Sequence, residues 1–286
     1  MTRTIERVGE FSTGWGESAL WDERSGRWWF VDCLANTVHW LGGDDPTLHT
    51  IAAPTMPTGI VPTEDDRLVV ALEDGLYVLD PTRETWSLVS LYPEGLGGRA
   101  NDACADGAGN LITGTLNLGP AEGSLWWFSA TEGWRRLADD IANTNGPQVV
   151  ELGGTTTLLV GDSSADYWRY DYEPTGAAVG PRSCFGAVDG LDGVADGTAL
   201  DVDGGLWCAL FGGSQLVRFT VDGLDESLRL DVLNPTDLAF GGPDLDVAYV
   251  TTASFGAEDR PGGLDGALLR IEGLGRGRAE PRFDLA

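Results

Sequence analysis

The stretch that decides the fold is DGTALDVDGGLW, residues 196–207, because it has a counterpart in NDACADGAGNL, residues 101–111. Aligned on their Asp-x-x-Gly turns, the two copies are offset by 95 residues. The first residue is Asn101 in one copy and Asp196 in the other. The chain therefore repeats a strand-turn-strand unit that begins with an oxygen-bearing side chain.

Short runs of β-branched and aromatic residues with period-2 patterning recur on both sides of this repeat, among them GRWWFVD, SLWWF, TLLVGD and VAYVTT. Glycine-rich turns separate the runs and leave no room for intervening helices. Forty-one glycines and 11 tryptophans agree with many tight turns between aromatic strands. The pattern predicts an all-β protein built from antiparallel sheets.

Similar positions at the start of strands recur at intervals of 41, 43, 44, 51 and 41 residues, at Glu17, Thr58, Asn101, Asn145, Asp196 and Asp237. A repeat of this length matches one four-stranded blade, so we expect a six-bladed β-propeller. The predicted blades cover residues 16–57, 58–98, 99–142, 143–193, 194–233 and 234–286. An extra strand near TIERVGEF is expected to join the last blade and close the ring, because unpaired edges are a liability. Residues 1–286 are thus expected to form one domain.

In a propeller the first strand of each blade lines the central channel, so residues at the start of these strands meet at one mouth. Glu17, Asn101, Asn145 and Asp196 would form a ring of oxygen atoms there. Carboxylate and amide oxygens without sulfur or imidazole suit a divalent cation such as Ca²⁺, Mg²⁺ or Mn²⁺. Asp106 and Asp201 occupy the later turns of their repeats and are expected to be structural.

The charge and the cysteines restrict the possible partners and location. A formal net charge of −27, with no lysine, argues against a nucleic-acid or anionic-membrane partner, because both need a cationic face. The N-terminus lacks an apolar signal region and no run approaches 18 apolar residues, so a cytoplasmic location is the default expectation. The four cysteines contain no Cys-x-x-Cys pair and are expected to be buried free thiols: Cys33, Cys104, Cys184 and Cys208.

Five segments together resemble the gluconolactonase, senescence marker protein (regucalcin) and luciferin-regenerating enzyme family. In chain order they read GESALWDERSGRWWFVD, RANDACADGAGNLITGTL, NTNGPQVVELGGTTTLLVGDS, ADGTALDVDGGLWCALFGGSQLVRF and NPTDLAFGGPDLDVAYVTTA. The resemblance spans about residues 15 to 270 and keeps the family's motif order. It implies a six-bladed propeller with one functional divalent metal held by a Glu, an Asn and an Asp.

Carried over by motif, the metal ligands are Glu17, Asn145 and Asp196. The substrate-contacting residues implied by the resemblance are Arg99 and Asn101, with Asp102 beside them.

The chain departs from the family pattern in three places. The usual Gly-Pro after the first Glu is replaced by Ser18-Ala19, and the usual Leu after Asn-Gly is Pro147. An acidic residue that some members carry after GTL is replaced by the segment Asn117-Leu118-Gly119. Recognition of substrate hydroxyl groups is therefore expected to differ.

The leading hypothesis is a metal-dependent hydrolase that opens a sugar-acid (aldono-) lactone. One divalent ion, Ca²⁺, Mg²⁺, Mn²⁺ or Zn²⁺, would polarise the lactone carbonyl while Asp196 acts as the base on the attacking water. Arg99 and Asn101 would orient the substrate. The alternatives are a lactonase or esterase for other esters on the same scaffold, and a calcium-binding propeller without turnover. The particular lactone, the physiological metal and the oligomeric state stay open.

Overall fold

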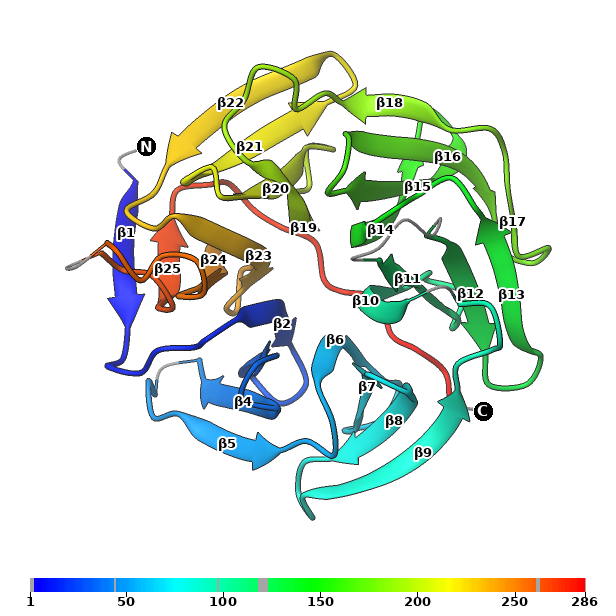
Figure 1. The fold of residues 1–286 in the computed structure, drawn as a ribbon, viewed down its shortest axis with the longest axis horizontal. Helices are drawn as coiled ribbons and strands as arrows, with labels where there is room; N and C mark the ends of the chain where they lie inside the picture. Colours follow the sequence, from blue (N-terminus) through cyan, green and yellow to red (C-terminus); the bar gives the residue numbers. More distant parts are fainter. Residues whose placement is uncertain (1–2, 44, 97, 118–122, 261–262, 286) are drawn as a thin grey trace.

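The computed structural model describes residues 3–43, 45–96, 98–117, 123–260 and 263–285. Within them every regular element is a β-strand, and the strands form six antiparallel sheets arranged as a ring (Figure 1). This arrangement confirms the predicted six-bladed propeller. None of the described residues forms a helix long and apolar enough to cross a membrane.

The first three blades follow the chain in order, each from the central channel outward. Blade one contains β2 (Gly16–Asp22), β3 (Arg27–Asp32), β4 (Thr37–Gly42) and β5 (His49–Ala52). Blade two contains β6 (Pro57–Pro62), β7 (Leu68–Leu72), β8 (Gly75–Asp80) and β9 (Thr85–Leu91). Blade three contains β10 (Arg99–Ala105), β11 (Leu111–Leu116), β12 (Leu125–Ser129) and β13 (Gly133–Ala138).

Blades four and five continue this order. Blade four contains β14 (Thr144–Leu152), β15 (Thr155–Asp162) and β16 (Tyr167–Glu173), and two short strands both pair with β16: β17 (Ala178–Val179) and β18 (Ser183–Gly186). Blade five contains β19 (Val194–Leu200), β20 (Leu206–Phe211), β21 (Gln215–Thr220) and β22 (Gly223–Arg229). The first strand of every blade starts within one residue of its predicted blade boundary.

Blade six joins the two ends of the chain. It contains β23 (Asn234–Gly241), β24 (Val247–Ala253), β25 (Leu268–Glu272) and, outermost, β1 (Thr4–Val8). Strand β1 pairs antiparallel with β25 from Thr4 opposite Glu272 to Val8 opposite Leu268. The predicted closure by the N-terminal strand is confirmed.

Six hydrophobic clusters fill the interfaces between neighbouring blades. Trp29 of blade one packs in one cluster with Val70 of blade two, and Trp207 of blade five shares another with Leu238 of blade six. Tryptophans on the strands are buried in these interfaces, among them Trp28, Trp29, Trp126, Trp127 and Trp207. Burying such side chains is the main stabilising term that holds the blades together.

All four cysteines are free thiols, but they are not all buried. Cys33, Cys104 and Cys208 are buried as predicted, whereas the prediction for Cys184 is wrong. Cys184 is exposed on β18, a short strand that pairs with β16 at the outer side of blade four.

The inner strands share an irregularity near their starts. In every blade the pairing of the first strand with the second shifts register between two positions: Glu17/Leu20, Pro57/Gly59, Ala100/Ala103, Asn145/Gln148, Ala195/Thr198 and Pro235/Leu238. A bulge of this kind leaves the skipped residues outside the ladder and re-aims their side chains. The skipped residues include Asn101, Asp102, Asp196 and Asp237.

The segment after β25 leaves blade six, so the prediction that this blade extends to residue 286 is wrong. Figure 1 shows the C-terminal segment crossing the ring. Gly277 forms a bridge with Asp201 after β19, and Phe283 forms one with Thr63 after β6. Both partners follow the ends of inner strands, so this segment covers the mouth of the channel opposite the bulges. We call residues 273–285 the C-terminal strap.

Candidate active site

The bulges bring the predicted site residues to one end of the channel, although not from one equivalent position. Glu17 and Asn145 are the last paired residues before their bulges, whereas Asn101 and Asp196 are the first residues inside theirs. Relative to the bulge, Asn101 and Asp196 therefore lie one residue later than Glu17 and Asn145. The shift matters because successive strand residues point to opposite sides.

Two residues next to predicted ligands have positive φ angles. Ser18 follows Glu17 with φ of 53°, and Gly146 follows Asn145 with φ of 47°. Serine in this region costs roughly 1–2 kcal/mol relative to glycine, and the Ser18 hydroxyl accepts a 2.7 Å hydrogen bond from the Ile60 N–H in return. A Cβ at residue 146 would lie 2.5 Å from the Thr198 nitrogen, so glycine is required there.

Four carboxyl groups are buried in or beside the channel: Glu17, Asp102, Asp196 and Asp237, each at most 8% exposed. Burial raises the pKa of Glu17 to about 8, and the charge of Asp102 adds to the shift. Burial likewise raises the pKa of Asp102 to about 6. The pKa values of Asp196 and Asp237 are also raised, first by burial and then by neighbouring carboxylates. Four ionised carboxylates in this space need a compensating cation.

Glu17 carries an oxygen atom without a partner, and the Asn145 amide meets a conflict in either orientation. Glu17 Oε1 accepts a 2.9 Å hydrogen bond from the indole of Trp15, but Glu17 Oε2 is buried and has no hydrogen-bond partner. The Asn145 side-chain atom that faces the channel lies 3.1 Å from Asp196 Oδ1 and 2.6 Å from Asn101 Nδ2. As oxygen it meets another acceptor at Asp196, and as nitrogen it meets another donor at Asn101.

The outer atom of the Asn145 amide decides between these orientations. As nitrogen it donates to Ser163 Oγ and, at 3.4 Å, to the Ala195 carbonyl, which accepts only from a donor. Asn145 Oδ1 therefore faces the channel beside Asp196 Oδ1. A cation between these two oxygens would remove their repulsion, and it would also give Glu17 Oε2 the partner that it lacks. The residues therefore fit a divalent ion. In the part of the chain that the structure describes, no three His, Cys, Asp or Glu side chains form a metal-binding group. The predicted set has only two carboxylates, and its third member is this amide.

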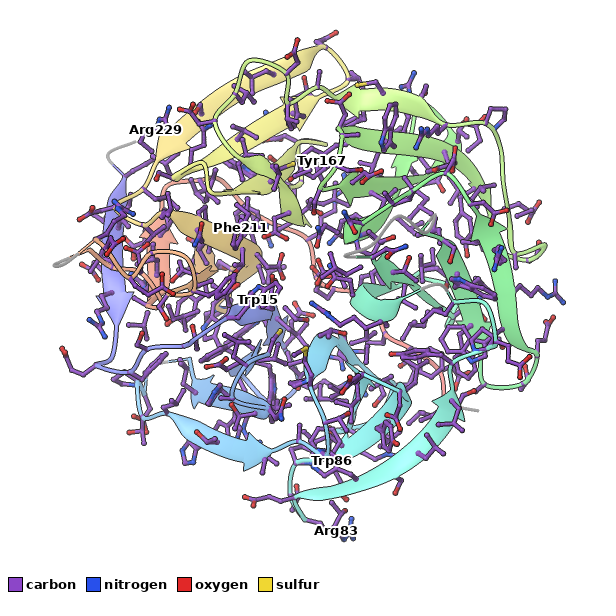
Figure 2. The ribbon with its side chains drawn as sticks, viewed as in Figure 1. Trp15, Arg83, Trp86, Tyr167, Phe211 and Arg229 are labelled. Atoms are coloured by element: carbon purple, nitrogen blue, oxygen red, sulfur yellow. The ribbon has the colours of Figure 1, made fainter. Side chains whose placement is uncertain are left out.

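Arg99 and Asn101 lie beside these ligands. Arg99 Nη1 donates to Asn101 Oδ1 over 3.2 Å, and Asn101 Nδ2 donates to Asn145 Oδ1. The Arg99 guanidinium also lies over the Trp15 ring, 5.5 Å from its centroid. Figure 2 shows Trp15 near the axis of the ring. The structure thus brings together Glu17, Arg99, Asn101, Asn145 and Asp196.

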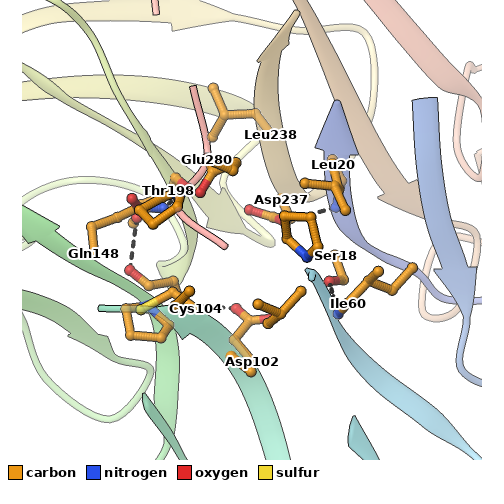
Figure 3. Close-up of a pocket in the computed structure, with 18 residues that line it drawn as sticks. Ser18, Leu20, Ile60, Asp102, Cys104, Gln148, Thr198, Asp237, Leu238 and Glu280 are labelled. Carbon is orange, nitrogen blue, oxygen red and sulfur yellow. Dashed lines mark hydrogen bonds between the residues drawn. The ribbon is translucent and has the colours of Figure 1, made fainter. Parts of the chain in front are cut away.

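Asp102 lies in the channel, where its charge acts on both Glu17 and Asp196. Its Oδ2 accepts a 2.8 Å hydrogen bond from the Gly146 N–H. With Asp237 and with Glu280 of the C-terminal strap it lines a cavity of about 40 Å³ (Figure 3). This volume is enough for about one water molecule and too small for a sugar lactone.

The sequence reasoning missed two residues of this region. Asp237 was recognised as a repeat position only, yet its Oδ2 accepts from the Ala19 N–H and its carboxyl lies in the channel. Its place in the 41-residue spacing was the available signal. Trp15 gave no signal, because it precedes the first blade strand. Of the segment Asn117-Leu118-Gly119, Leu118 and Gly119 lie outside the described residues, and the Asn117 N–H donates to Asn143 Oδ1.

Comparison with known proteins shows the family of the chain. The model of the SMP-30/gluconolactonase/LRE-like region matches residues 15–254. A pentonolactonase of Haloferax volcanii is 27% identical over 99% of both chains, and an L-arabinolactonase of Azospirillum brasilense is 28% identical over 92% of this chain and 91% of its own. A luciferin-regenerating enzyme structure superposes with a TM-score of 0.89 and 26% identity, covering 99% of this chain and 100% of that one.

Proposed function

The chain belongs to the SMP-30/gluconolactonase/LRE-like family, and we propose that it is a metal-dependent lactonase that hydrolyses a sugar-acid (aldono-) lactone. One observation carries the proposal: the unpartnered Glu17 Oε2 and the facing oxygens of Asn145 and Asp196 lie in one site with Arg99. The sugar-lactonase names of relatives that cover nearly the whole chain support the substrate class.

Glu17, Asn145 and Asp196 would hold the divalent ion. When bound, the ion supplies a Lewis acid for the lactone carbonyl. Arg99 offers N–H donors at the same mouth, and Asn101, whose two N–H bonds are donated to Thr144 O and Asn145 Oδ1, offers its Oδ1 as an acceptor. Together they would orient the hydroxyl groups of the substrate. Such positioning supplies much of the rate acceleration in enzymes.

Asp196 is the proposed general base. Its carboxylate takes a proton from the attacking water while the water oxygen bonds to the carbonyl carbon. The bond from that carbon to the ring oxygen then breaks, and Asp196 returns the proton to the leaving oxygen. The product is the open-chain hydroxy acid. Its Oδ1 lies 3.1 Å from the side-chain atom of Asn145, so the carboxylate lies beside the proposed ion site.

The test is hydrolysis of a panel of aldonolactones, followed by acid release with a pH indicator. Metal-stripped protein receives Ca²⁺, Mg²⁺, Mn²⁺ or Zn²⁺ in turn. We expect turnover only with a restored ion. Equal turnover in the stripped protein would overturn the metal dependence, and ion binding without turnover of any lactone would favour the calcium-binding alternative.

A second candidate, a lactonase for esters with an apolar substituent, is favoured by the side chains at the mouth. Phe255 is 52% exposed and stacks on Trp15, with ring centroids 6.0 Å apart. An exposed aromatic beside a polar site suits an apolar substituent. Adding alkyl-substituted γ-lactones to the panel separates the candidates, because kcat/KM above that of the aldonolactones would replace the leading proposal.

A further inference from the structure

We propose that Trp15 is a positioning residue of the lactone site, whose single indole fixes both the Glu17 carboxylate and the Arg99 guanidinium. The inference rests on the proposed function, since it concerns how two residues of the same site are held relative to each other. Trp15 lies outside the set of residues that the family resemblance implies.

The first contact is the hydrogen bond to Glu17. The Trp15 Nε1–H donates to Oε1 over 2.9 Å, while Oε2 of the same carboxylate has no partner. One oxygen is therefore fixed and the other is left available as a ligand. A donor of this kind sets the orientation of a metal-binding carboxylate, and removing such a partner typically costs about 10- to 100-fold in metal affinity.

The second contact is with Arg99. Its guanidinium carbon lies 5.5 Å from the centroid of the Trp15 ring, within the range of a cation–π interaction. Among the described residues no carboxylate forms a salt bridge with Arg99. The indole and the Asn101 amide therefore hold this side chain, and the guanidinium keeps donors for a substrate oxygen.

Trp15 is itself held firmly enough to act as a reference point. The backbone N–H of Trp15 donates to Asp32 Oδ1 over 3.1 Å, and its backbone carbonyl accepts from the Cys33 N–H over 2.9 Å. Phe255 stacks on the indole with an interplanar angle of 12°. The backbone and the ring are thus fixed from blades one and six, so movement of the indole would disturb both contacts together.

These contacts predict different effects for two substitutions. Trp15→Phe removes the N–H donor and keeps a ring beneath Arg99, so it should weaken ion binding and leave KM nearly unchanged. Trp15→Leu removes the ring as well, so it should also raise KM. A purely structural role would lower thermal stability without separating ion affinity from KM.

The experiment titrates Ca²⁺ and Mn²⁺ into each variant by calorimetry and then measures kcat and KM at saturating ion. For Trp15→Phe we expect about 10- to 100-fold weaker ion binding and KM within about twofold of wild type. For Trp15→Leu we expect a similar loss of ion affinity and a KM increase of about two- to fivefold. Trp86→Phe is the matched control, since its indole donates to the Ala52 carbonyl away from the axis (Figure 2), and it should resemble wild type.

Wild-type ion affinity in Trp15→Phe would overturn the proposal. Unchanged KM in Trp15→Leu would show that the indole does not position Arg99 for the substrate. Trp15→Phe keeps an aromatic ring at this position, so the ion measurement stands even where Trp15→Leu fails to fold. Calorimetry needs no turnover. A wild-type protein that binds ions but hydrolyses no lactone would overturn the proposed function. The ion titration of Trp15→Phe would still test the contact between Trp15 and Glu17.

Discussion

Asp196 and Asp201 lie at opposite mouths of the channel, within one strand and its turn, and their carboxylates have different surroundings. Both side chains are nearly fully buried. Asp201 accepts hydrogen bonds from two backbone N–H groups and forms a 2.6 Å ion pair with Arg218. Asp196 instead faces Asn145 Oδ1 and lies near other carboxylates. At the mouth covered by the C-terminal strap (the far mouth) the charge of Asp201 is compensated within the protein. At the mouth with the bulges (the near mouth) Asp196 faces an amide oxygen and other carboxylates.

Asp22 at the far mouth shows the same compensation. Burial alone would raise the pKa of Asp22, but hydrogen bonds from Ser25 and Arg282 outweigh burial and lower it. Arg282 belongs to the C-terminal strap and donates to Asp22 Oδ1 over 2.7 Å. Asp106 is likewise held, by the N–H groups of Ala108 and Asn110. The expected structural roles of Asp106 and Asp201 agree with these contacts.

The largest expected effect separates Asp196 from Asp201. Asp196→Asn keeps an oxygen for the ion but removes the proposed base, so kcat for lactone hydrolysis at saturating ion should fall about 10²- to 10⁴-fold. Asp201→Asn should lower the melting temperature through its lost ion pair and leave kcat near wild type. A wild-type kcat in Asp196→Asn would move the base to another group.

A substitution in the C-terminal strap should affect stability alone. Phe283 is fully buried against the second and third blades, so Phe283→Ala should lower the free energy of unfolding by about 3–5 kcal/mol. Ion affinity measured by calorimetry below the melting transition should stay at the wild-type value. A tenfold loss of ion affinity would mean that the two mouths are coupled through the cavity lined by Asp102, Asp237 and Glu280.

Glu17→Gln should have opposite effects on binding and stability. Loss of the charge should weaken Ca²⁺ or Mn²⁺ binding at least about tenfold, while the metal-free protein becomes more stable because one buried carboxylate is gone. Calorimetry and thermal melts in chelator measure the two effects. The exposed Glu73 provides the control Glu73→Gln, which should change neither. Unchanged affinity for both ions would show that the ion does not bind at Glu17.

The smallest expected effect is the pH dependence of metal-free stability. The pKa values of Glu17 and Asp102 are raised in the folded protein, from usual values of 4.5 and 3.8 to about 8 and about 6. Their contribution to stability is therefore fully present below about pH 4 and is lost as the pH rises through 6 and 8. Melting temperatures in chelator should decline over this window, and saturating ion should reduce the decline. A flat profile in chelator would contradict the raised pKa values.

The blades were predictable from the sequence because their signal is local. Alternating apolar residues and glycine turns specify each strand and its hairpin, and their recurrence every 41 to 51 residues indicates six blades. The same spacing placed Glu17, Asn101, Asn145 and Asp196 near one mouth. Arg99 followed from the family motif.

The direction of the side chains was less predictable, because a bulge inserts an extra residue and so changes which residues of the strand point to a given side. Whether Asn101 or Asp102 faces the near mouth depends on how β10 pairs with β11, and nothing in residues 99–105 alone decides it. The course of the C-terminal strap could not be predicted from the repeat, because its contacts join residues 277 and 283 to strand ends far away in the chain.

The number of blades, the closing strand and the chemical types of residue at the channel mouth are predictable from the sequence, because they follow from local periodicity and composition. The tertiary structure alone decided which oxygens lack partners, which acids are compensated, and that Trp15 contacts both Glu17 and Arg99. Charge compensation and desolvation depend on neighbours from different blades, and only the closed ring brings those neighbours within a few ångströms of each other.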